Sequence, residues 1–310
     1  MKAFSALPLS WPELARRTYQ KATADNYLDL AAQLSYYFFL ALFPAILFLL
    51  ALASFFPLQN LTDEIGSAIG GIASPEVTQL IQDQMQRLAN SNSGGLLTFG
   101  VLAALWSSSA ALVSIVTALN RAYGLTEERP WWKVRLGASA LTIAVAVLVL
   151  CGLSLVLAGP ALAAYVGDTL GWGDFVKWTW LIVQWPLVFA LVSTALGLVY
   201  YFGPDAEQDW VWITPGAVDG TAIWLLASLA FKLYVAKFTD YNASYGAVGG
   251  VIVMLLWFYI SGIALILGAE TNATIEQASP HGKAPGQKGP SGKRLIGARA
   301  ARAFSGPFAA

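Results

Sequence analysis

Five stretches of this sequence contain no charged residue over at least 27 positions: 30–62, 88–120, 136–167, 178–204 and 241–269. About 20 consecutive apolar residues allow a helix to cross the hydrocarbon core of a bilayer, so each stretch can hold a span and its interfacial ends. The stretches are continuously apolar rather than alternating, which excludes the strands of a membrane β-barrel. The charge pattern therefore predicts an all-α membrane protein.

The composition supports the same class. Hydrophobic residues make up 57% of the 310 residues and charged residues 12%, whereas soluble domains carry about 25% charge. So few charged side chains cannot cover the surface of a soluble enzyme of this length. The 18 basic and 18 acidic residues cancel, which argues against a basic nucleic-acid-binding protein, and no nucleic acid is expected as a partner.

Six transmembrane helices are predicted within residues 30–275. Five come from the uncharged stretches, and one is interrupted by Asp219 and Lys232 but is otherwise apolar. The predicted spans are Leu30–Phe56, Leu96–Leu119, Leu136–Leu157, Trp178–Phe202, Ile213–Val235 and Gly246–Gly268. The expected fold is a six-helix bundle accompanied by amphipathic interfacial helices.

Three segments lie outside these spans. Residues 1–29 are predicted to hold an amphipathic helix on the cytoplasmic membrane surface, with Ser10 and Glu13 as a capping box. The periplasmic loop 57–95 is predicted to be partly helical, because Ser74, Pro75 and Glu76 suit a helix start. Residues 276–310, rich in Gly, Pro, Lys and Arg, are predicted to form a disordered basic cytoplasmic tail.

Basic residues predict the orientation, since short cytoplasmic loops are enriched in Lys and Arg. Fourteen of the 18 basic residues fall in the N-terminal segment, the second loop and the tail, and the other four are Arg87, Lys177, Lys232 and Lys237. Both termini are therefore expected to be cytoplasmic.

The sequence contains few residues that could form a metal site or a hydrolase active site. The single Cys, Cys151, lies in an apolar run, and the single His, His281, lies in the tail. A zinc site needs three or four converging ligands, and a serine or cysteine hydrolase needs a His beside its nucleophile. We expect no catalytic site, no metal and no cofactor.

Several motifs carry a family resemblance. The first span reads AAQLSYYFFLALFP, the second ends LNRAYG and is followed by RPWWKVR, and the fourth ends YYFGP. The end of the chain contains YNASYG, LLWFYIS and LGAETN. Together these motifs resemble the YihY/BrkB family over roughly Tyr19 to Ile275. That family comprises bacterial inner-membrane proteins once labelled ribonuclease BN and linked in places to virulence. The resemblance implies six helices and a cytoplasmic-membrane location, and these residues give the ribonuclease label no support.

Polar residues within the spans are the first candidates for a polar cavity, because ionisable groups inside a membrane are usually functional. Asp219 is expected either to bind a cation or carry a proton, or to be a carboxylate near the cytoplasmic interface. Lys232 is expected to extend to the outer headgroups. In the first span, Gln33, Tyr36 and Tyr37 precede Pro44, which can open a kink that exposes backbone carbonyls. The alternative is a bent helix whose polar groups bond to neighbouring helices.

The last two spans contribute four further candidate residues. Tyr241 and Asn242 lie in a predicted turn that ends at Gly246, and Glu270 and Asn272 lie at the inner end of the last span. Gly246 and Gly250 form a G-x-x-x-G pair that favours close helix packing.

Two classes of function remain open at this point. The first is a transporter or flippase-like protein for a lipid, an envelope precursor or a small solute. The second is a non-transporting scaffold that recruits envelope proteins. Membrane lipids are expected partners in either case, and a polar cavity near the midplane would favour the first class.

Overall fold

The computed structural model describes residues 9–53, 94–171, 173–206, 214–237 and 239–278. Eight helices and no strand occur in these ranges. The helices are α1 (Trp11–Ala24), α2 (Tyr27–Ala53), α5 (Gly94–Ala122), α6 (Trp131–Leu157), α7 (Gly159–Leu170), α8 (Gly173–Phe202), α9 (Pro215–Lys237) and α10 (Thr239–Ala278).

Six of these helices are long and apolar enough to cross a membrane: α2, α5, α6, α8, α9 and α10. They coincide with the six predicted spans, which confirms the all-α class and the number of candidate spans. The predicted helix after Ser74 and the tail from residue 279 onward lie outside the described residues.

Helix α1 confirms the predicted helix before the first span, although its details differ. Its buried residues are Leu14, Thr18 and Ala22, whereas Trp11 and Tyr19 are exposed. Ser10 makes no capping bond through its side chain, so the predicted capping box is wrong. Glu13 instead accepts hydrogen bonds from Arg16 and Arg17 one turn further on. These pairs satisfy Glu13 within the helix and draw it away from the N-cap.

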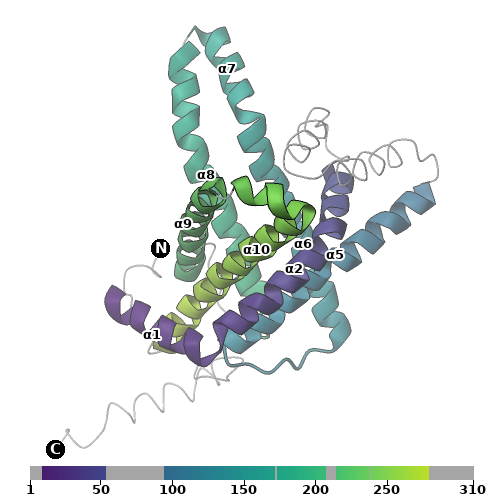
Figure 1. Cartoon of the computed structure of the whole chain (residues 1–310), viewed down its shortest axis with the longest axis vertical. Helices are drawn as coiled ribbons and strands as arrows, with labels where there is room; N and C mark the ends of the chain where they lie inside the picture. Colours follow the sequence, from purple (N-terminus) through teal and green to yellow (C-terminus); the bar gives the residue numbers. More distant parts are fainter. Residues whose placement is uncertain (1–8, 54–93, 172, 207–213, 238, 279–310) are drawn as a thin grey trace, which may run out of the picture.

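Helix α7 was not predicted. It follows α6 after Ala158 and is followed by Gly171, whose φ of 72° lies in the left-handed region that glycine tolerates best. Figure 1 shows α7 beside the start of α8, extending away from α1. Helix α7 and the start of α8, which follow the third span, therefore form a helical hairpin.

The predicted turn at Tyr241–Gly246 is also wrong at the level of the backbone. These residues belong to α10, which begins at Thr239 and continues for 40 residues to Ala278. Asn and Gly favour turns in water, but here they lie in the first turns of a helix that continues into the last candidate span, Gly249–Ala278.

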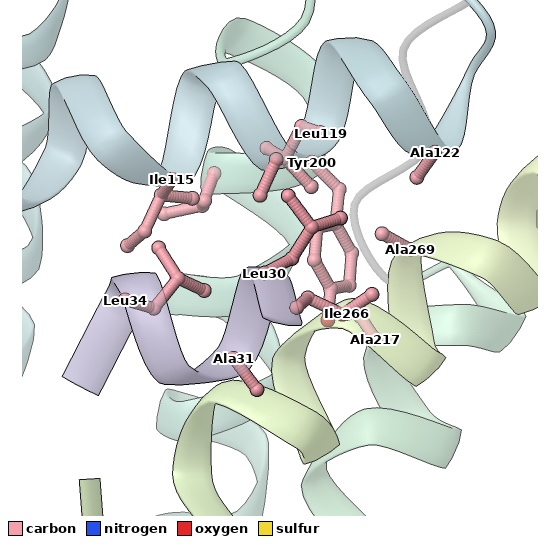
Figure 2. Close-up of a cluster of buried hydrophobic side chains, with 12 residues drawn as sticks. Leu30, Ala31, Leu34, Ile115, Leu119, Ala122, Tyr200, Ala217, Ile266 and Ala269 are labelled. Carbon is pink, nitrogen blue, oxygen red and sulfur yellow. The ribbon is translucent and has the colours of Figure 1, made fainter. Parts of the chain in front are cut away.

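The core lies where α2, α5, α8, α9 and α10 meet. Figure 2 shows Tyr200 of α8 inserted between Leu30, Leu119 and Ile266. The Tyr200 hydroxyl, which is buried, donates a 2.8 Å hydrogen bond to the Leu265 carbonyl oxygen of α10. This aromatic ring therefore fills the core and fastens α8 to α10.

Helix α10 approaches its neighbours at small residues. A methyl group added to Gly262 would lie 3.3 Å from the Ala31 Cα of α2, and one added to Gly268 would lie 2.6 Å from the Gly216 carbonyl oxygen of α9. Such close backbone contact is the usual way in which membrane helices gain packing energy. Gly250, by contrast, has open space around it, so its predicted packing role is wrong. The G-x-x-x-G pair that packs is Gly216 with Gly220.

We predict that Gly268→Ala destabilises the protein, because the new methyl group would overlap backbone atoms that cannot rotate away. Overpacking of this kind costs about 1–3 kcal/mol. Gly137→Ala is the matched control, since a methyl group there would meet nothing within 4 Å. Thermal unfolding in detergent should show a lower melting temperature for Gly268→Ala alone. Equal melting temperatures for the two variants would contradict the tight α9–α10 crossing.

Candidate functional site

The candidate site lies at the end of the bundle where α1 meets α10, which we call the α1 end. Figure 1 shows α1 across the last turns of α10 and beside the start of α2. Asn26, with φ of 55°, forms the sharp turn between α1 and α2. Asn is among the few residues that tolerate this conformation. The turn brings the polar edge of α1 against the other helices.

Lys21 of α1 is the centre of the site. Its ammonium donates hydrogen bonds to Glu270 Oε2 at 2.6 Å, to Asp25 Oδ2 at 3.2 Å and to the Ala122 carbonyl oxygen at the end of α5. An ammonium group has three N–H donors, so all three are used. One side chain thus connects α1, α5 and α10.

Glu270 is fully buried, with a side-chain exposure of 0%. Its Oε2 atom accepts the bond from Lys21, whereas Oε1 has no hydrogen-bond partner among the described residues. A buried carboxylate is costly unless it is paired. Lys21 therefore determines whether Glu270 can carry its charge at this position.

A second polar network joins α9 to α10 beside this ion pair. The Asn272 side chain accepts a 2.8 Å bond from the Gly216 N–H and donates a 2.9 Å bond to Thr214 Oγ1. The first N–H groups of a helix have no partner within it, so Asn272 satisfies one of these groups of α9. Thr271 Oγ1 donates to Asp219 Oδ2 at 2.8 Å.

A third cluster, the loop clamp, consists of Asn120, Glu127, Arg129 and Asp205. Arg129 binds Glu127 through both Nε and Nη2, at 2.8 and 2.7 Å, and donates to the Gly203 carbonyl oxygen. Asn120 donates to Glu127 and accepts from the Asp205 N–H. Burial on its own would raise the pKa of Glu127, but the hydrogen bonds from Arg129 and Asn120 outweigh it and lower the pKa. The Glu127 hydrogen bond raises the pKa of Arg129.

Outside the bundle, α1 carries its own ion pairs. Arg16 and then Arg17 lower the pKa of Glu13 to about 2 through their hydrogen bonds. These side chains are largely exposed, and exposed pairs add little stability.

An open polar groove runs between α1 and the end of α10, with a cavity volume of about 380 Å³. Its lining residues are Arg17, Gln20, Lys21, Thr274, Gln277 and Ala278. The polar cavity described here is therefore at the α1 end, and neither Asp219 nor Gln33 lines it.

The structure brings three of the nine candidate residues together: Asp219, Glu270 and Asn272. The first-span candidates lie elsewhere, because Gln33 is exposed on α2 and Tyr36 is 58% exposed. Tyr37 packs edge-on against Tyr36 with ring centroids 5.6 Å apart.

The remaining candidate residues are Pro44 in the first span and Tyr241 and Asn242 before the last span. Helix α2 continues through Pro44. The hydroxyl of Ser35, in the same span, donates a hydrogen bond to the Leu255 carbonyl oxygen of α10. That contact fits the alternative in which polar groups of the first span bond to a neighbouring helix. The side chains of Tyr241 and Asn242 lie outside the described residues, and only their helical backbone is described.

Sequence reasoning missed Lys21 and the loop clamp. Lys21 sits at the edge of an amphipathic helix, where a basic residue ordinarily contacts headgroups, and its partner is 249 residues away. The clamp had a usable signal, since Asn120 belongs to the LNRAYG motif and Gly203 to the YYFGP motif. Arg129 belongs to the RPWWKVR motif, so residues of three motifs that flank predicted spans could have been paired across the loops.

The fold and the site define a multi-helix membrane protein with a polar, charged network at one end of its central helix. The family model of Virulence factor BrkB matches residues 18–292, so the chain belongs to the BrkB family. The resemblance found in the sequence motifs is thereby confirmed.

Relatives of this chain include a ribonuclease-like protein and several UPF0761 membrane proteins. The chain is 38% identical to the ribonuclease-like protein YfkH of Bacillus subtilis over 250 residues, covering 80% of this chain and 89% of YfkH. It is 28% identical to the UPF0761 membrane protein RC1_0578 of Rhodospirillum centenum over 82% of this chain and 55% of that protein. A UPF0761 membrane protein of Alteromonas mediterranea is 25% identical over 86% of this chain and 88% of the relative.

These names describe membrane proteins more often than enzymes, and the ribonuclease-like name belongs to YfkH. The chain spans little more than half the length of several UPF0761 relatives. No solved structure matches this chain.

We predict that Glu270→Gln and Lys21→Met each destabilise the protein, because Lys21→Met leaves the buried Glu270 carboxylate without its partner and Glu270→Gln removes the charge that Lys21 pairs with. Breaking a buried pair costs about 3–5 kcal/mol, and we expect the lower end because the Lys21 side chain is 21% exposed. The double variant should lose less than the sum of the single losses. Thermal unfolding in detergent measures all three.

Lys232→Met is the control, since Lys232 is an exposed lysine on α9. Additive losses in the double variant would show that Lys21 and Glu270 do not depend on each other.

Proposed function

We propose that this protein acts in the bacterial cytoplasmic membrane as a transporter or flippase-like protein for a lipid, an envelope precursor or a small solute. The observation that carries the proposal is the buried ion pair between Lys21 and Glu270. It joins a surface helix to the central helix of the bundle, beside an open polar groove.

The proposal follows from how a buried ion pair affects the stability of a helix bundle. Replacing a buried ion pair by apolar residues is often neutral or stabilising, so a static bundle gains little from one. A pair of this kind is better suited to a contact that must form and break. Helix α1 has the geometry for such movement. It joins α2 through the single turn at Asn26, and its contacts with other helices are mainly with α10.

A second candidate, a scaffold that recruits envelope proteins, has its own support. Several polar side chains within the bundle bond directly between helices, as Ser193 does to Thr221 and Trp224 to Ser261. A bundle closed in this way around its middle suits a protein that transports nothing.

Reconstitution into proteoliposomes tests the proposal. We expect the protein either to scramble a fluorescent phospholipid, measured by dithionite quenching, or to drive solute uptake under an imposed proton gradient. Glu270→Gln should slow the active process about tenfold, equivalent to roughly 1.4 kcal/mol in the barrier, while Lys232→Met should leave it unchanged.

Rates equal to protein-free liposomes in both assays would overturn transport. Stable envelope partners in a pull-down would then favour the scaffold.

The orientation is part of the same proposal. The basic residues described at the α1 end, in α1, the loop clamp and the start of α6, support a cytoplasmic location for that end. We expect green fluorescent protein fused to the C-terminus to fluoresce and alkaline phosphatase fused there to be inactive. Fusions at Gly171, between α7 and α8, should give the reverse result. Active phosphatase at the C-terminus would refute the orientation.

A further inference from the structure

The groove between α1 and α10 has the chemistry of an oxyanion site. Two of its six lining residues, Arg17 and Lys21, are cationic, three carry neutral donors, and none is a carboxylate. A binding site differs from a charged surface because its polar groups are directed into a cavity.

Lys21 contributes no hydrogen bond, because its three N–H groups already have acceptors, and two of these, Asp25 and Glu270, are carboxylates that offset its charge. Arg17 donates through Nε to Glu13 Oε1 at 2.6 Å. Among the described residues, that contact leaves the terminal N–H groups of the guanidinium for a ligand, since arginine has five donors in a planar fork.

Thr274 is the observation that marks the groove as a site. Its side chain lines the groove, the residue is only 6% exposed, and Oγ1 has no hydrogen-bond partner among the described residues. A buried hydroxyl without a partner is costly, and rotation of the Thr274 side chain toward the groove would let a ligand accept its hydrogen bond. The carboxamides of Gln20 and Gln277 add donors on either side.

The surroundings define the ligand further. Glu276 places a carboxylate on the last described turn of α10. This negative side disfavours a doubly charged free phosphate and favours a singly charged phosphodiester. Helix α1 also exposes Trp11 (66%) and Tyr19 (62%), and such aromatic side chains favour the headgroup region of a bilayer.

We propose that the groove formed by Arg17, Gln20, Thr274 and Gln277 binds the phosphodiester headgroup of a membrane phospholipid. Arg17 and Thr274 donate to the phosphate oxygens, and the carboxamides of Gln20 and Gln277 add neutral donors. This binding is independent of transport, because a scaffold could hold a lipid in the same groove.

Native mass spectrometry of the full chain in detergent tests the proposal, with phosphatidylglycerol, diacylglycerol and inorganic phosphate added in separate experiments. We expect one phosphatidylglycerol to remain bound where diacylglycerol does not. Arg17→Gln and Thr274→Val should each weaken that binding about fivefold, which corresponds to roughly 1 kcal/mol.

Arg16→Gln is the matched control, since Arg16 is the neighbouring exposed arginine, also contacts Glu13 and does not line the groove. Equal losses for Arg16→Gln and Arg17→Gln would reduce the effect to general surface charge and overturn the site. Equal retention of diacylglycerol would overturn phosphate recognition, and binding of inorganic phosphate alone would overturn the lipid.

Discussion

The close approach of α10 to α9 and α2 is the contact on which the rest of this structure depends. Apolar surface gives little drive for helices to associate within a membrane, so they gain stability from packing and from bonds between them. Gly262 against Ala31, and Gly268 against Gly216, allow backbones to touch. Once α10 is placed in this way, its last turns present Glu270, Thr271 and Asn272 to α1 and α9. The polar network at the α1 end follows from that placement.

The motifs that identify the family acquire physical meaning in this arrangement. In LGAETN, Glu270 accepts from Lys21, Thr271 donates to Asp219 and Asn272 caps α9. In LNRAYG and YYFGP, Asn120 and Gly203 belong to the clamp that ties two loops together through Arg129. These residues hold helix ends in place, which is a role that composition alone does not reveal.

The sequence was a good guide to the spans, and it identified some residues of the polar network at the α1 end but not Lys21. Five uncharged stretches and one nearly uncharged stretch are long enough to cross a bilayer, so six spans could be predicted. Helix α7 was missed because it continues α6 beyond a single break at Ala158. Asp219, Glu270 and Asn272 were identified as ionisable or polar groups within apolar segments. Lys21 could not be identified in the same way, because its pairing depends on how α1 folds back over α10. Gln33 and Tyr36 are exposed on α2, and polarity within a span does not say which side faces the bundle.

Lys21 can also be compared with a metal ion. Its ammonium has three oxygen ligands from three parts of the chain: a carboxylate of α10, a carboxylate just beyond α1 and a backbone carbonyl that ends α5. A bound cation would cross-link the same helices, but its occupancy would vary with the ion concentration of the compartment. A cation carried on a side chain is always present at a ratio of one to one. Arginine could not replace it, because a planar guanidinium cannot direct donors to three oxygens arranged around a point. The charge that joins these three oxygens is therefore part of the chain itself.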